Sequence, residues 1–131
     1  MIDVEVFGAG LAPEAPAPAE VRRLCELTAQ SRGVSSGHVA VEYVAAARIA
    51  ELNERHRSKL GATDVLSFPI DGDDPGVEPR ELGDIVICPA HTSDLREAIV
   101  HGMLHLLGMD HETDSGEMLA LQDELMAKVQ R

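Results

Sequence analysis

Residues 82–111 read LGDIVICPAHTSDLREAIVHGMLHLLGMDH and place a strand, a helix and a group of histidines next to one another. The short apolar run LGDIVICP, 82–89, predicts a strand in the protein interior. Asp94 and Glu97 form a capping pair that predicts the start of the next helix. Gly108 is suited to end that helix in a left-handed conformation. The histidines therefore lie at the end of a helix and in the turn that follows it.

The rest of the chain shows strand-like and helix-like patterns in turn. Further strands are expected at 2–7, 38–45 and 63–70. Helices are expected at 19–31, from 46 to about 57 and, after the capping pair Asp114 and Glu117, to about 129. A Pro/Ala-rich link at 10–18 is too short to divide domains, and the acidic segment 71–80 is predicted to be a loop. The pattern predicts a single α+β domain over residues 1–131, with one mixed sheet of about four strands packed with helices.

Composition limits the possible partners. The formal net charge is −12, which disfavours non-specific binding to nucleic acid or to anionic membranes. Four of the eleven basic residues nevertheless lie within twelve positions, from Arg48 to Lys59, and predict a local cationic patch. No apolar run approaches the length of a membrane span, and the two cysteines are isolated. A reducing, cytoplasmic location without membrane contact is therefore expected.

The stretch HGMLHLLGMDH has the ligand spacing of the zinc peptidase motif H-E-x-x-H-x-x-G-x-x-H. His101 and His105 lie one helical turn apart and face the same way, and the turn at Gly108 brings His111 back towards them. Three imidazoles predict one Zn²⁺ per chain with an open coordination position, although imidazole also suits Ni²⁺, Cu²⁺ or Fe²⁺. Asp110 either orients a ligand imidazole or caps the turn.

Gly102 stands where the peptidase carries its catalytic glutamate, so the motif lacks the base that peptide hydrolysis needs. Phosphodiester cleavage instead requires cations that stabilise charge on the phosphate oxygens. Arg55, Arg57 and Lys59 offer such cations for substrate binding, with Arg57 and Lys59 as the catalytic candidates. The alternative is that these cations only solvate a helix end. Asp84 or Asp110 is a candidate for assisting proton transfer or orienting a ligand.

Three segments resemble the YbeY family of bacterial endoribonucleases and ribosomal RNA maturation factors: LNERHRSKLGATDVLSFP (52–69), LGDIVIC (82–88) and HGMLHLLGMDH (101–111). The resemblance implies an α+β fold with zinc held by His101, His105 and His111. It implies a functional arginine at Arg57, with Lys59 beside it. It also implies cleavage of single-stranded RNA, maturation of the 3′ end of small-subunit ribosomal RNA and a role in ribosome quality control.

The chain departs from the family pattern at two places. The segment 89–100 is shorter than usual, and His56 stands where a tyrosine is common. Because the protein is acidic, weak binding to free RNA is expected, with docking on the ribosome or on a basic ribosomal protein raising the effective concentration. The nucleophile remains open between a zinc-bound hydroxide and the 2′-hydroxyl of the RNA. The alternatives are a non-catalytic, metal-stabilised ribosome assembly factor and a zinc metallopeptidase.

Overall fold

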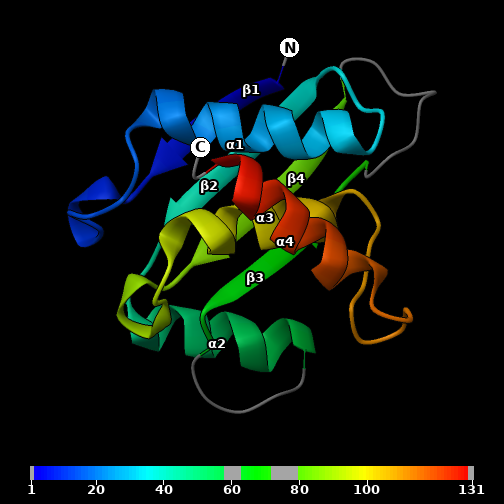
Figure 1. The fold of residues 1–131 in the computed structure, drawn as a ribbon. Helices are drawn as coiled ribbons and strands as arrows, with labels where there is room; N and C mark the ends of the chain where they lie inside the picture. Colours follow the sequence, from blue (N-terminus) through cyan, green and yellow to red (C-terminus); the bar gives the residue numbers. More distant parts are fainter. Residues whose placement is uncertain (1, 58–62, 72–79, 130–131) are drawn as a thin grey trace.

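The computed structural model describes residues 2–57, 63–71 and 80–129. Its helices and strands, in chain order, are β1 (Ile2–Phe7), η1 (Ala9–Leu11), α1 (Pro18–Ser31), β2 (Gly37–Tyr43), α2 (Ala46–Arg57), β3 (Val65–Pro69), β4 (Glu81–Ile87), η2 (Pro89–His91), α3 (Leu95–Leu106) and α4 (Glu117–Val129). Figure 1 shows the sheet crossed by the helices, with α2 set apart from α1, α3 and α4.

The four strands form one mixed sheet in the order β1-β2-β4-β3. β1 and β4 both run parallel to β2, whereas the edge strand β3 runs antiparallel to β4. The predicted α+β class with one mixed sheet is therefore confirmed. No helix in the described ranges is both long and apolar enough to cross a membrane.

Neighbouring residues of β4 belong to different halves of the core. Ile85 and Ile87 pack with α1, α3 and α4, whereas Val86 packs with Ile49 and Leu52 of α2. Because successive side chains of a strand point to opposite faces, the three helices cover one face of the sheet and α2 covers part of the other. β4 is thus buried on both faces, which explains why its sequence is an apolar run.

Helix α3 lies unusually close to the sheet at Gly102. A Cβ atom at this position would come within 2.6 Å of Cγ2 of Ile85, whose side chain is fully buried. The carbonyl oxygen of Gly102 also accepts a hydrogen bond from Ser67 Oγ of β3, at 3.1 Å. Gly102 therefore has a packing role, since any side chain here would push α3 away from β4.

The ends of α3 follow the predicted signals. The Asp94 side chain accepts a hydrogen bond from the backbone N–H of Glu97 at 3.1 Å, as a capping residue does. Gly108 adopts a φ of 94°, and the N–H of Met109 then reaches back to the carbonyl of Leu104 at 3.0 Å. Both ends of the helix that carries the histidines are therefore determined by local sequence.

Some predicted boundaries differ from the observed ones. The strand expected at 82–89 ends at Ile87, because Pro89 starts the short helix η2. The strand expected at 38–45 ends at Tyr43, and the one expected at 63–70 covers only Val65–Pro69. Most of the predicted loop at 71–80 lies outside the described residues.

Candidate metal centre

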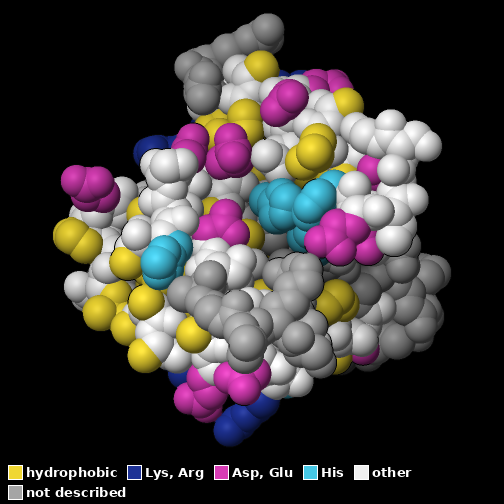
Figure 2. All heavy atoms as spheres, turned by 90° about the horizontal axis from the view of Figure 1, so that it is seen from below, with side chains coloured by type: hydrophobic (Ala, Val, Ile, Leu, Met, Phe, Trp, Pro, Cys, Tyr) yellow, Lys and Arg dark blue, Asp and Glu magenta, His cyan; other side chains and the backbone are white. Residues whose placement is uncertain are grey.

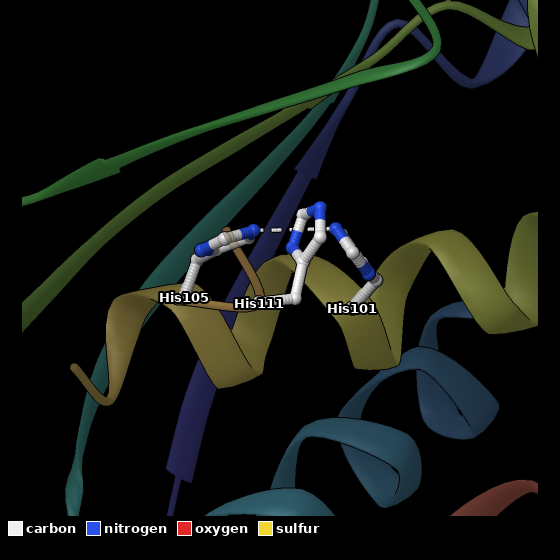
Figure 3. Close-up of side chains that lie close together, drawn as sticks. All are labelled: His101, His105 and His111. Carbon is white, nitrogen blue, oxygen red and sulfur yellow. Dashed lines mark hydrogen bonds between the residues drawn. The ribbon is translucent and has the colours of Figure 1, made fainter. Parts of the chain in front are cut away.

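Three histidines converge at the C-terminal half of α3 and the turn that follows it. His101 and His105 project from successive turns of the helix, and their Nε2 atoms lie 3.2 Å apart (Figure 3). The chain reverses at Gly108 and returns His111, so that one nitrogen from each ring lies within 4.8 Å of the others. Two nitrogens bound at zinc's usual 2.0–2.1 Å in tetrahedral geometry are separated by about 3.3 Å. The observed spacing of His101 and His105 therefore fits a shared metal ion.

The outer nitrogens of two rings already have partners that orient them. Nδ1 of His105 lies 3.0 Å from the carbonyl oxygen of Met109, and Nδ1 of His101 lies 2.7 Å from Oε1 of Gln122. Both partners are acceptors, so Nδ1 carries the hydrogen in each ring. The Nε2 lone pairs consequently face the centre of the cluster.

The surroundings of His105 favour the neutral imidazole, which is the form that binds metal. Burial lowers the pKa of His105, and the neighbouring rings of His101 and His111 lower it further. Nδ1 of His111 is buried without a hydrogen-bond partner in the part of the chain that the structure describes. A buried nitrogen without a partner is costly unless something binds it. These donors fit Zn²⁺, and no other group of three potential ligands occurs within residues 2–57, 63–71 and 80–129.

The cluster opens into a cleft of about 860 Å³. One wall is β3 with the residues before it, and the other is the turn that carries His111. Figure 2 shows histidine side chains at a hollow of the surface, with carboxylates beside them. The carboxylates that line the cleft belong to Asp64, Asp110 and Glu112. The histidine cluster is thus accessible from the surface through this cleft.

The model of the family Endoribonuclease YbeY matches residues 13–130. The chain belongs to the YbeY family. Endoribonuclease YbeY of Pseudomonas entomophila is 40% identical over 129 residues, which cover 88% of this chain and 82% of that protein. Endoribonuclease YbeY of Nocardioides sp. is 37% identical over 133 residues, covering 84% of this chain and 89% of that protein.

A solved structure also resembles this fold. The solution structure of TM1509 from Thermotoga maritima superposes with a TM-score of 0.54 at 27% sequence identity. The match covers 98% of this chain and 89% of that one. The likeness therefore extends over the whole α+β domain and is not confined to the histidine motif.

Of the three predicted cationic residues, the structure describes the side chain of Arg55 but not those of Arg57 and Lys59. Arg55 is exposed on α2, where Nη2 lies 3.4 Å from a carboxylate oxygen of Glu51, and it does not line the cleft. Arg57 is the last residue of α2, but its side chain lies outside the described part of the structure, as does Lys59. None of the described residues that line the cleft is a lysine or an arginine.

The two candidate aspartates have different positions. Asp110 lines the cleft. Its carboxylate accepts a hydrogen bond from the backbone N–H of Glu112 at 3.0 Å and so caps the turn. Asp84 is not brought to the histidines, contrary to expectation. Its neighbour Ile85 faces α3, so strand alternation turns Asp84 to the opposite face of the sheet. Burial raises the pKa of the Asp84 carboxyl there, and the charge of Glu81 raises it further.

Sequence reasoning missed two contributors to the site. His56 lines the cleft at the end of α2, with its ring edge-on to Phe68 at a centroid distance of 4.9 Å. Gln122 reaches His101 from α4, although the two residues are 21 positions apart. A signal for Gln122 was present, because it occupies a core position of an amphipathic helix, where a polar side chain needs a partner.

Proposed function

We propose that this chain is a zinc-dependent endoribonuclease that cleaves single-stranded RNA. Membership of an endoribonuclease family supplies the reaction class. The observation that carries the proposal is the cluster of three imidazoles at the open cleft. His101, His105 and His111 would hold the ion. When bound there, zinc stabilises negative charge on a phosphate oxygen and lowers the pKa of a bound water.

The packing of Gly102 supports RNA cleavage over peptide hydrolysis. A peptidase of this ligand spacing needs a glutamate at this position. Here the Cβ direction leads towards Ile85 in the core, and the closest approach would be 2.6 Å. A glutamate would have to displace the helix that holds His101 and His105. The site therefore favours a reaction whose proton acceptor does not come from this position.

We assign charge neutralisation to cationic residues at and just after the end of α2. The described walls of the cleft carry carboxylates and no cations, so a phosphodiester needs positive charge from elsewhere. We assign this role to Arg57 and Lys59, with Arg55 contributing from the same helix end. An arginine can hold two phosphate oxygens at once, and a lysine adds a compact charge.

The acidic protein also needs help to retain RNA. With a net charge of −12, affinity for free RNA is expected to be low and strongly salt-dependent. We propose that the substrate is the 3′ region of small-subunit ribosomal RNA, processed and checked on the ribosome in the cytoplasm. A basic ribosomal protein is the partner that the acidic surface suits, and docking would raise the local RNA concentration.

A matched pair of variants tests the metal-site assignment. His105→Ala removes a ligand from the cluster, whereas His91→Ala removes an exposed histidine outside it. Cleavage of a single-stranded RNA should be lost in His105→Ala and kept in His91→Ala, with a duplex of the same sequence resistant to both. His105→Ala protein that cuts RNA at the wild-type rate contradicts the proposal.

A second pair of variants tests the cationic residue Arg57. Arg57→Ala should slow cleavage by about 10- to 100-fold, because a hydrogen bond to a charged group contributes about 1.5–3 kcal/mol. Arg48→Ala is the control, since Arg48 is on the same helix and pairs with Glu51 at 2.9 Å. Equal rates for the two variants would remove Arg57 from the mechanism.

The ends of the cleavage products identify the nucleophile. A 2′,3′-cyclic phosphate indicates the 2′-hydroxyl of the RNA, and a 5′-phosphate indicates water.

A further inference from the structure

Gln122 is a polar residue in an otherwise apolar interface. It is only 7% exposed, and the other buried residues of α4 are Met118, Leu125, Met126 and Val129. Burying an amide group without hydrogen bonds is costly. The contact that the structure provides is the one from Gln122 Oε1 to Nδ1 of His101, at 2.7 Å. The position of Gln122 is thus tied to the metal centre and not to the core alone.

An acceptor at this position determines which nitrogen of His101 is free. Because Oε1 only accepts, Nδ1 must carry the ring hydrogen, and the Nε2 lone pair is left facing Nε2 of His105 at 3.2 Å. In Figure 3 these two nitrogens point toward one another and are joined by the dashed line. With the opposite tautomer, an Nε2–H group would point into the cluster and occupy the place of the metal ion.

The other two histidines are oriented differently. His105 is held by the backbone carbonyl of Met109, which no substitution removes, and Nδ1 of His111 has no partner among the described residues. Gln122 is therefore the side chain, within the described ranges, whose oxygen selects the tautomer of a ligand histidine. It lies on a different helix from the ring that it orients.

We propose that Gln122 is a positioning residue of the metal centre: it holds His101 in the tautomer that binds metal through Nε2, and it couples the docking of α4 to metal binding. This inference rests on the proposed function only in requiring that the three histidines bind zinc. It does not depend on the identity of the substrate.

Three variants of the full-length protein test this role. Gln122→Met keeps the length of the side chain and removes the acceptor, Gln122→Glu keeps the acceptor, and Gln30→Met changes an exposed glutamine of α1. The measurement is the dissociation constant of Zn²⁺ by competition with a coloured chelator. Gln122→Met should bind zinc about 10- to 100-fold more weakly, the usual effect of losing a partner of a ligand histidine. Gln122→Glu and Gln30→Met should stay within a few-fold of the wild type.

A spectroscopic readout separates orientation from general damage to the fold. Long-range ¹H–¹⁵N correlation spectra of the zinc-saturated protein report which ring nitrogen of His101 carries the hydrogen. The wild type and Gln122→Glu should show Nδ1–H, and Gln122→Met should show a broadened or mixed signal. Urea unfolding of the chelator-treated variants identifies any loss of fold, and Gln122→Met must unfold cooperatively for its zinc affinity to count.

The outcomes distinguish the two proposals. Equal zinc affinity in Gln122→Met and wild type, or Nε2–H on His101 in the zinc-loaded wild type, overturns the role of Gln122 and leaves RNA cleavage standing. If Gln122→Met binds zinc more weakly but the zinc-loaded wild type cleaves no RNA, the positioning role of Gln122 is supported and the proposed function is overturned. A wild type that binds no zinc overturns both.

Discussion

Gly102→Ala tests whether the helix of the metal centre is packed against β4 as closely as the structure shows. The added Cβ would lie 2.6 Å from Cγ2, 3.2 Å from Cγ1 and 3.3 Å from Cδ1 of Ile85. Carbon atoms prefer about 3.5–4.0 Å, so α3 or Ile85 must move by about 1 Å. Overpacking of this kind costs about 1–3 kcal/mol, and alanine in a helix recovers about 1 kcal/mol relative to glycine. The variant should therefore lose about 1 kcal/mol of unfolding free energy.

The assay is urea unfolding in the presence of a chelator, followed by circular dichroism, so that bound metal does not contribute. A loss of about 1 kcal/mol lowers the midpoint by about 0.5 M urea at an m-value of about 2 kcal/mol/M. Gly10→Ala is the control, because nothing lies within 4 Å of a Cβ atom at that position. It should change stability by less than about 0.5 kcal/mol.

The same substitution should change sign when Ile85 is shortened. Ile85→Ala removes all three atoms that the new Cβ would meet, so only the helix propensity gain of about 1 kcal/mol remains. Gly102→Ala should then stabilise the Ile85→Ala background, giving a coupling energy of about 2 kcal/mol between the two positions. If Gly102→Ala stabilises the wild-type background as well, the close packing of α3 on β4 is wrong.

Three further predictions concern stability. The pKa of His38 is raised mainly by the hydrogen bond of its ring to Glu81. A second hydrogen bond, to Glu5, raises it further, whereas burial opposes the shift. The protonated ring therefore stabilises the folded protein fully below pH ~6.5, and this stabilisation is lost as the pH rises through the folded pKa. His38→Gln should therefore destabilise the protein more at pH 6 than at pH 8.5 in urea unfolding, and an equal loss at both values would contradict this. Asp94→Ala should cost about 1 kcal/mol in the same assay through loss of the cap on α3, whereas no loss would remove Asp94 from that role. Zinc at 100 times its dissociation constant should add about 2.7 kcal/mol to the wild type and nothing to His105→Ala, with equal gains in both excluding the site.

Local signals account for the parts of the fold that were predicted correctly. Asp94 and Gly108 bracket α3 through contacts within a few residues, so the sequence around them was sufficient. The ligand spacing of His101 and His105 follows from the helical repeat, and one glycine turn brings His111 back. These features depend on neighbours in the chain and little on the rest of the fold.

The features that were not predicted depend on contacts between distant segments. β4 lies between β2 and β3 in the sheet. This strand order depends on tertiary contacts, and no local sequence pattern predicts it. Asp84 was a candidate for assisting proton transfer or orienting a ligand, but strand alternation in β4 turns it to the other face of the sheet. His38 bridges carboxylates of β1 and β4, which are far apart in the sequence. Gln122 meets His101 only because α4 docks on α3.

The central claim is that zinc on the three histidines is required for cleavage of RNA. The most direct measurement is the rate of single-stranded RNA cleavage by one preparation before chelation, after verified removal of zinc, and during titration with Zn²⁺. The rate should fall to background on removal and return fully at about one zinc ion per chain, the stoichiometry of a single tetrahedral site, whereas His111→Ala should stay at background throughout. Undiminished cleavage by protein verified to be free of metal, or recovery of His111→Ala to the wild-type rate, would contradict the claim.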